Sequence, residues 1–208
     1  MSRTEKYDAF AGEFTAREYG DPDRYFRRRA EIVLGLGPRL APGDAVVDLA
    51  CADGSFAPLL IDAGLAYTGV DLSEPMVAVA RERIGSRGRV ELGDLTTWAP
   101  PAPVAMTSCF RSLHFVPDRT AWFRHLASFT EKKVVFDVSP RRVPLATLRS
   151  ELVAAGLTRV DVHPFFVPQH GRLPGPVAAG LRVLEGAGPL AAALLRLRFV
   201  AIVAASRG

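Results

Sequence analysis

An apolar stretch that runs into a turn of small residues constrains the fold most. Residues 46–54 read Val-Val-Asp-Leu-Ala-Cys-Ala-Asp-Gly, a buried strand followed by a tight loop. Residues 67–71 read Tyr-Thr-Gly-Val-Asp, a second strand whose terminal acid, Asp71, lies 23 residues after Asp48. A strand, a small-residue loop, a helix and a strand that ends in a carboxylate predict a βαβ unit that binds a nucleoside.

Strands and helices alternate along most of the remaining chain. Strands are predicted at residues 46–49, 66–70, 89–92, 104–109, 133–138, 158–166 and 199–205. Helices are predicted at residues 5–19, 22–36, 56–63, 119–129 and 145–155, and another begins with Ser73 as N-cap and Pro75 in its first turn. This alternation predicts an α/β fold, a parallel sheet with helices on both faces. Residues 171–196 interrupt the alternation with helical segments, which makes an antiparallel last strand plausible.

Composition narrows the classes of partner. The net charge of +4 comes almost entirely from arginines, which are scattered apart from residues 27–29, so no nucleic-acid partner is predicted. Residues 189–206 are apolar but carry Arg196 and Arg198, so no membrane insertion is predicted. With no apolar run at the N-terminus, and with Cys51 and Cys109 expected as buried reduced thiols, a cytoplasmic protein is expected.

The sequence resembles the class I methyltransferases that use S-adenosylmethionine. Residues 48–54 are similar to that family's Asp-x-Gly-x-Gly-x-Gly motif, with Ala50 and Ala52 where glycine is usual. Asp71 and residues 90–95 are similar to the motifs that follow its second and third strands. The cofactor implied is S-adenosylmethionine, with S-adenosylhomocysteine as the product.

The resemblance also implies an architecture. It is a three-layer Rossmann-like sandwich whose seven-stranded, mostly parallel sheet has the order 3-2-1-4-5-7-6, with strand 7 antiparallel and helices on both faces. The length of 208 residues favours one domain over residues 1–208. Within it, residues 1–40 would form a helical lid and residues 167–197 a helical insertion between strands 6 and 7.

Each motif implies a role toward the cofactor. Asp71 can accept hydrogen bonds from both ribose hydroxyls, and Asp94 would accept one from the adenine amino group. Asp48 could meet an ammonium group or a bound water. The full predicted set is Tyr7, Tyr19, Asp48, Ala50, Cys51, Ala52, Gly54, Asp71, Leu72, Met76, Asp94, Leu95 and Phe110. The structural alternatives are an ordinary turn for the loop and a helix cap for Asp71.

The segment after the fourth strand bears on the reaction. Residues 107–115 lack the Asn/Asp-Pro-Pro-aromatic signature of enzymes that methylate exocyclic amines, and resemble the small-molecule branch of the family. His114 is the candidate general base, and Arg111 could orient an anionic substrate. Each also has a purely structural alternative, a brace for the loop and a surface ion pair. Asp118 and Asp137 do not form a convincing metal site, so no metal is predicted.

The prediction is therefore a methyltransferase of a small, partly hydrophobic metabolite, with oxygen favoured over nitrogen or carbon. The apolar residues 173–197 are expected to shape the acceptor pocket, and the protein is expected to be a monomer or a homodimer. Alternatives are an N-methyltransferase of a small amine and a homologue that binds the cofactor without catalysis. A nicotinamide dehydrogenase is disfavoured, because Ala50, Ala52 and Ser55 replace its Gly-x-Gly-x-x-Gly glycines.

Overall fold

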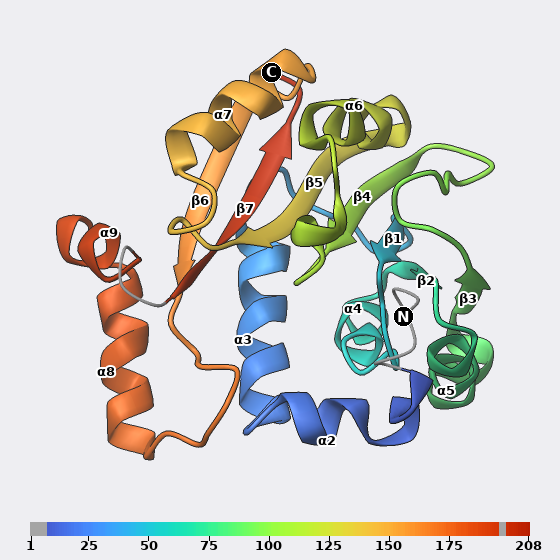
Figure 1. Cartoon of the computed structure of the whole chain (residues 1–208), viewed down its shortest axis with the longest axis horizontal. Coiled ribbons are helices and arrows are strands. Elements are labelled where there is room, and N and C mark those ends of the chain that lie inside the picture. Colours follow the sequence, from blue (N-terminus) through green and yellow to red (C-terminus); the bar gives the residue numbers. More distant parts are fainter. Residues whose placement is uncertain (1–7, 196–198) are drawn as a thin grey trace.

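The computed structural model describes residues 8–195 and 199–208, which contain one seven-stranded sheet (Figure 1). The strands are β1 (Ala45–Leu49), β2 (Ala66–Asp71), β3 (Arg89–Leu92), β4 (Val104–Cys109), β5 (Thr130–Val138), β6 (Arg159–Phe165) and β7 (Val200–Ser206). Their order is β3-β2-β1-β4-β5-β7-β6, and β7 runs antiparallel to both of its neighbours while the other pairs are parallel. The predicted strand order and the antiparallel last strand are confirmed.

Helices cover both faces of the sheet, as predicted. One face packs against α3 (Pro22–Gly35), α4 (Ala57–Asp62) and α5 (Glu74–Ile84), and the other against α6 (Arg119–Phe129) and α7 (Leu145–Ala154). Figure 1 shows α8 (Gly175–Glu185) and α9 (Pro189–Leu195) beyond the β6 edge of the sheet. The shorter elements are η1 (Ala11–Glu13), α2 (Phe14–Glu18), η2 (Gly85–Arg87) and η3 (Leu113–Phe115).

The long N-terminal helix predicted at residues 5–19 is wrong in its described part. The chain forms instead the single 3-10 turn η1 and the five-residue helix α2, and neither has a side-chain cap. Gly12 is a poor helix former, and the extended Tyr19 ends α2 before the N-cap Asp21 starts α3. The result is a short segment that lies across one end of α3 in Figure 1.

Lys133 on β5 is a charged residue inside the core. Its Nζ donates hydrogen bonds of 2.7 Å to the carbonyl oxygens of both Val33 and Leu36 at the end of α3. These carbonyls have no partner within the helix, so the ammonium group caps α3 and attaches it to the sheet. Burial lowers the pKa of Lys133 to about 8. The sequence predicted that this strand begins at residue 133, because the preceding residues 130–132, with which β5 begins, are polar.

Two local predictions around the second strand are met. The Ser73 hydroxyl accepts a hydrogen bond of 3.3 Å from the Met76 amide, so Ser73 is the N-cap of α5, and Pro75 lies in the first turn.

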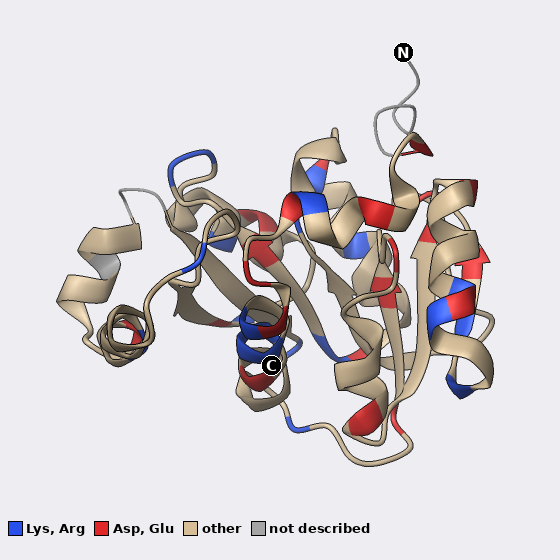
Figure 2. Ribbon diagram, turned by 90° about the horizontal axis from the view of Figure 1, so that it is seen from below, with Lys and Arg blue, Asp and Glu red and all other residues tan. Residues whose placement is uncertain are grey.

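Charged residues of both signs are spread over the described part of the molecule. Figure 2 shows basic and acidic residues interspersed over several helices and strands.

Gly54 is required by packing between the loop after β1 and α5. It has a φ of +72°, and a Cβ placed there would lie 3.0 Å from Ala80 Cβ and 3.2 Å from Ala80 Cα. An L side chain would therefore meet both backbone strain and a helix that cannot easily move. Packing against Ala80, rather than the predicted contact with the cofactor, therefore requires glycine at position 54.

We expect Gly54→Ala to lower the free energy of unfolding by about 2–3 kcal/mol, because it adds left-handed strain and overpacking. Gly35→Ala, at the end of α3 with open space around it, is the matched control and should raise stability by up to about 1 kcal/mol. Urea unfolding followed by circular dichroism measures both. Equal effects of the two substitutions would contradict the packing argument.

Candidate functional site

A cavity of about 320 Å³ lies where the ends of β1, β2 and β4 and the loop after β3 meet the N-terminal segment. Among its lining residues are thirteen that the sequence predicted: Tyr19, Asp48, Ala50, Cys51, Ala52, Asp71, Leu72, Met76, Asp94, Leu95, Phe110, Arg111 and His114. Gly54 does not line it, because it faces α5. Tyr7 lies outside the described residues.

The loop after β1 has a left-handed backbone where alanine replaces glycine. Ala50 has a φ of 57° and Ala52 a φ of 51°. Each such alanine costs about 1–2 kcal/mol relative to a right-handed conformation. The Ala52 amide donates a 2.8 Å hydrogen bond to Asp71 Oδ2, and the Cys51 amide donates one of 3.0 Å to the Val70 carbonyl. The loop thus keeps, with alanines, a shape that glycine usually supplies.

Asp71 holds this loop with one oxygen and the start of α5 with the other. Its Oδ1 accepts from the Ser73 amide at 3.0 Å, while Oδ2 accepts from Ala52. Burial raises the pKa of Asp71, and the backbone donors of Ser73 and Ala52 oppose that rise. Each carboxylate oxygen has a second lone pair, so ligand hydroxyls can still bind. Capping and ligand binding are therefore compatible at this residue.

Asp48 is a buried acid below the loop. Its Oδ1 accepts a 2.6 Å hydrogen bond from the Ser108 hydroxyl, and its Oδ2 accepts one of 3.3 Å from the Tyr67 hydroxyl. Burial raises its pKa to about 6, although Ser108 and the Arg29 charge act in the opposite direction. An ammonium group in the cavity would favour the ionised form of this acid.

Arg29 is a buried cation that the sequence analysis did not assign to the site. It is 4% exposed, and its guanidinium carbon lies 4.3 Å from the ring centre of Phe110 and 4.8 Å from that of Tyr25, with Phe26 and Phe56 at 5.4 Å. It lines the cavity, and its Nη2 has no hydrogen-bond partner among the described residues. A ligand carboxylate would satisfy this donor.

The helical spacing contained a signal for Arg29. Phe26, Arg29, Ala30 and Val33 follow the i, i+3, i+4, i+7 pattern of one helix face, and all four are buried. An arginine at an apolar position of such a face is a candidate for a buried functional cation. Because residues 27–29 were considered together as one basic run, the apolar-face position of Arg29 was overlooked.

The N-terminal segment is hydrogen-bonded directly to the loop after β1. The Thr15 hydroxyl of α2 lies 3.0 Å from Asp53 Oδ1 and 2.7 Å from Ser55 Oγ. Asp53 is 2% exposed and also pairs with Arg83 of α5 at 3.0 Å. Asp53 and Ser55 line the cavity and were also missed, because Asp53 is at a variable position of the motif and Ser55 lies just after it.

Asp94 occupies a turn after β3. Its Oδ1 accepts hydrogen bonds from the Thr96 amide at 2.8 Å and the Thr96 hydroxyl at 2.7 Å. Asp94 therefore stabilises an ordinary turn after the strand, and it also lines the cavity. Its contact with an adenine amino group stays a prediction.

On the side of β4 and β5, the cavity is lined by Arg111, His114 and Arg142, which follow these two strands. Arg111 has a φ of 58°, and its amide donates a 2.6 Å hydrogen bond to Asp137 Oδ1. Partial burial, the charge of Arg142 and that of Arg111 lower the pKa of His114, so its imidazole is neutral at neutral pH. Ala50, Ala52 and Arg111 are the three non-glycine residues with positive φ in the described ranges, and all three line this cavity.

Residues 173–195, the described part of the apolar stretch 173–197, lie elsewhere, contrary to expectation. They contribute nothing to the lining of this cavity. Residues of α8 and its leading segment line a second cavity of about 540 Å³ with the arginine-rich face of α3, where Arg28 binds the buried Glu185 at 2.5 Å. Leu181 and Leu184 of α8 and Ala191 and Leu195 of α9 pack instead with the core cluster that contains Phe166.

Two further kinds of site, a metal site and a membrane span, can be assessed for residues 8–195 and 199–208, which the structure describes. No group of three or more His, Cys, Asp or Glu side chains is placed to hold a metal ion. No single helix is long and apolar enough to cross a membrane, although the pair α8 and α9, bent by 111°, together meets the length and composition criteria.

The sheet order, the acids at adjoining strand ends and the strained small-residue loop define the Rossmann-like fold of class I methyltransferases. Residues 46–133 match the family model described as a methyltransferase domain. This family uses S-adenosylmethionine, and the resemblance seen in the sequence is confirmed for this segment. The orphaned Arg29 donor and the acids Asp48 and Asp71 fit the carboxylate, ammonium and ribose of that cofactor.

Curated relatives are trans-aconitate 2-methyltransferases. That of Rhizobium meliloti is 30% identical over 115 residues, which is 54% of this chain and 44% of the relative. That of Escherichia coli O157:H7 is 33% identical over 114 residues, 54% of this chain and 45% of the relative. The chain thus matches less than half the length of these relatives.

Solved structures share the fold. A methyltransferase of Haloferax volcanii, solved in complex with the Trm112 methyltransferase activator, superposes with a TM-score of 0.69 at 16% identity, covering 100% of this chain and 98% of that one. The magnesium protoporphyrin IX methyltransferase of Synechocystis PCC 6803 with bound S-adenosylmethionine has a TM-score of 0.55 at 18% identity, covering 100% and 85%. At such identities the likeness shows the fold alone.

The raised pKa of Asp48 predicts a pH-dependent stability. The unfolded chain ionises this acid near 3.8 and the folded chain near 6, so the folded state binds more protons in between. Its stabilising contribution is full below about pH 4 and is lost as the pH rises to about 6. Asp48→Asn lacks this titration, so its stability relative to the wild type should improve by about 2 kcal/mol from about pH 4.5 to about pH 7.5.

Urea unfolding at the two pH values measures this difference. Asp62→Asn, at an exposed acid of α4, is the matched control and should show little change. A pH-independent difference between Asp48→Asn and the wild type would show that Asp48 titrates normally.

Proposed function

We propose that this chain is an S-adenosylmethionine-dependent methyltransferase of a small molecule, with oxygen as the acceptor atom, working as one domain. The observation that carries this proposal is the single cavity in which Asp48, Asp71 and the left-handed loop lie at one end and Arg111 and His114 at the other. The methyltransferase domain matched at residues 46–133 supports it.

The bound cofactor would supply a methyl group on a positively charged sulfur. Asp71 would orient the ribose through its free lone pairs, and Leu72 and Met76 would pack beside the nucleoside. Asp48 and Arg29, which bear opposite charges, would hold the ammonium and carboxylate groups of the amino-acid end. Positioning supplies much of the acceleration in such a displacement, so rigid contacts matter more than an acid or a base.

The acceptor end favours oxygen over an amine. Arg111 and Arg142 are cationic and would repel an ammonium group, and the two nearby acids both contact Arg111: Glu18 lies 4.0 Å from its Nη2, and Asp137 accepts the hydrogen bond of its amide. Two oxygen acceptors suit this end: a hydroxyl, whose proton the neutral His114 would take, and a carboxylate. The trans-aconitate methyltransferases to which the chain is similar are named for an acid.

A non-catalytic homologue was motivated by Ala50 and Ala52. Both alanines adopt the left-handed backbone that glycine usually supplies, with the Ala52 amide held by Asp71. The motivation for that alternative is therefore weaker than the sequence suggested, and binding with catalysis is the better proposal.

Binding of S-adenosylhomocysteine and methyl transfer from labelled S-adenosylmethionine test the proposal. Asp71→Ala should weaken binding about tenfold to a hundredfold, because it removes charge-assisted hydrogen bonds to two hydroxyls. Asp62→Ala, at an exposed acid of α4, is the control. Calorimetry gives the Kd, and an intact near-ultraviolet spectrum shows that the variant is folded. If the wild type binds neither nucleoside, the proposal is wrong.

Arg29→Met should weaken S-adenosylhomocysteine binding about tenfold to a hundredfold, because the apolar side chain fills the aromatic cage but donates no hydrogen bond. Arg27→Met, two residues away on the exposed side of α3, is the matched control. The same calorimetry should show 5′-methylthioadenosine, which lacks the carboxylate, binding both variants alike. An equal loss for both ligands would contradict the assigned carboxylate contact.

A further inference from the structure

The cavity contains two buried arginine donors without partners. Three buried side-chain polar atoms in the described residues lack a hydrogen bond: Arg29 Nη2, Arg111 Nη1 and Ser206 Oγ. The two arginine atoms belong to residues that line the same cavity. Because buried donors without partners are costly, two such groups facing one cavity indicate two anionic ligand groups.

The proposed cofactor accounts for only one of these donors. S-adenosylmethionine carries a single carboxylate beside its ammonium group, and the neighbouring opposite charges of Arg29 and Asp48 match that pair. Arg111 comes from the loop after β4 and lines the cavity with His114 on the side of β4 and β5, whereas Asp48 and Asp71 lie at the ends of β1 and β2. Its unpaired donor therefore remains for a group of the acceptor.

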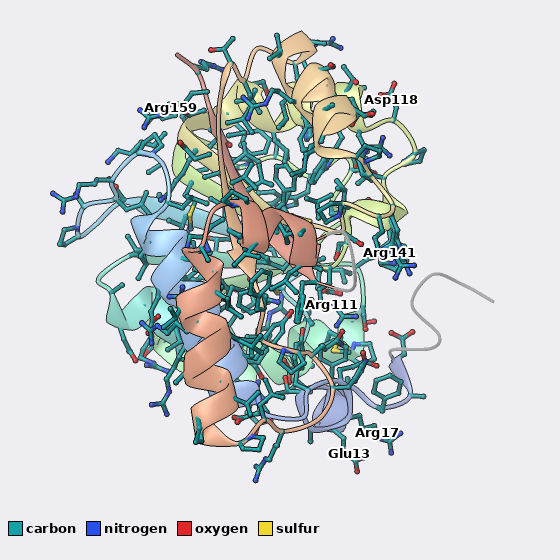
Figure 3. All side chains as sticks on the ribbon, turned by 90° about the vertical axis from the view of Figure 1, so that its left-hand side faces the viewer. Glu13, Arg17, Arg111, Asp118, Arg141 and Arg159 are labelled. Atoms are coloured by element: carbon teal, nitrogen blue, oxygen red, sulfur yellow. The ribbon has the colours of Figure 1, made fainter. Side chains whose placement is uncertain are left out.

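The backbone of Arg111 is held in a strained conformation beside the cavity. The residue has a φ of 58°, a conformation that arginine adopts only under constraint, and Asp137 Oδ1 holds its amide at 2.6 Å. Its guanidinium lies 5.9 Å from the ring centre of Tyr19, and Figure 3 shows it between the sheet and the N-terminal segment. Glu18 is 4.0 Å from Nη2, which leaves Nη1 unpaired.

Further positive charge gathers around Arg111. Arg142, from the segment after β5, lines the same end of the cavity, and both arginines act electrostatically on His114. Glu18, 4.0 Å from Arg111 Nη2, and Asp137, which acts on His114 against the two arginines, offset part of this positive charge.

We propose that the methyl acceptor is a carboxylate, held by Arg111 with Arg142 nearby, and that the product is a methyl ester; this rests on the proposed function. One carboxylate oxygen would accept the Nη1 hydrogen bond while the other is the nucleophile. A lone pair of that oxygen forms the new O–C bond to the methyl group. The methyl–sulfur bond breaks, and its electron pair neutralises the sulfonium to a thioether.

No proton leaves in this reaction, so no general base is needed. His114 then serves as a hydrogen-bonding residue of the cavity lining and is not the base that the sequence suggested. His114→Gln, which keeps a hydrogen-bonding side chain, should change turnover by the same factor at every pH between about 6 and 9, because no proton is removed. A loss of a hundredfold or more, rescued by raising the pH, would indicate a hydroxyl acceptor and overturn the carboxylate.

The full chain with S-adenosylmethionine should be offered aliphatic, unsaturated and aromatic carboxylic acids of four to twelve carbons. Each acid is paired with its primary alcohol, its amine and its primary amide. Acids should gain one methyl group by mass spectrometry, and mild alkali should release it as methanol, as an ester requires. Methylation of alcohols or amines without acids, or an alkali-stable product from a hydroxy acid, would overturn the proposal.

Variants of Arg111 test its role separately from folding and cofactor binding. Arg111→Met should raise KM for the acid at least tenfold and leave the Kd for S-adenosylhomocysteine within twofold, with partial rescue in Arg111→Lys. Arg159→Met, at an exposed arginine of β6, is the control. An unchanged KM for the acid in Arg111→Met would overturn the assignment.

Calorimetry of the acids with the S-adenosylhomocysteine complex covers the case in which no acid turns over. Acids that bind the wild-type complex at least tenfold more tightly than the Arg111→Met complex support the carboxylate site. If the protein binds S-adenosylhomocysteine but no acid binds or reacts, the carboxylate proposal alone fails. If it binds no cofactor, the proposed function itself fails.

Discussion

The hydrogen bond from the Ala52 amide to Asp71 is the interaction on which the site depends. It joins the ends of β1 and β2 across the loop, and it holds a left-handed alanine that would otherwise relax. The second oxygen of Asp71 fixes the start of α5 through Ser73. One carboxylate thus sets the positions of the loop and the helix and is also placed for the proposed ribose contact, so an amide or a methyl group at position 71 could not serve all three.

The cavity also brings opposite charges close together. The acids at the ends of β1 and β2 create a negative end, while Arg29 places one cation among aromatic rings beside Asp48. A buried guanidinium is tolerated there because the ring faces interact favourably with it and its remaining donor faces the cavity. The arginine is therefore stable before a ligand arrives and keeps a donor available for one.

The sequence predicted what local chemistry determines and missed what tertiary packing determines. Asp48, Asp71 and the loop were found because parallel strands bring their ends to one edge, whatever covers the rest of the sheet. Arg29 was missed because the burial of a helix face depends on the elements packed against it, here those that carry Phe56 and Phe110. The lining role of residues 173–197 was misjudged because an apolar composition requires burial but does not say against which surface.

The N-terminal segment connects the two ends of the cavity. Thr15 binds Asp53 and Ser55 of the cofactor loop, and three residues later Glu18 lies beside Arg111 at the acceptor end. Because α2 is only five residues long, a displacement of Thr15 must also move Glu18 and Tyr19. The shape of the loop after β1 and the charge available at Arg111 therefore depend on one arrangement, because the same short segment contacts both.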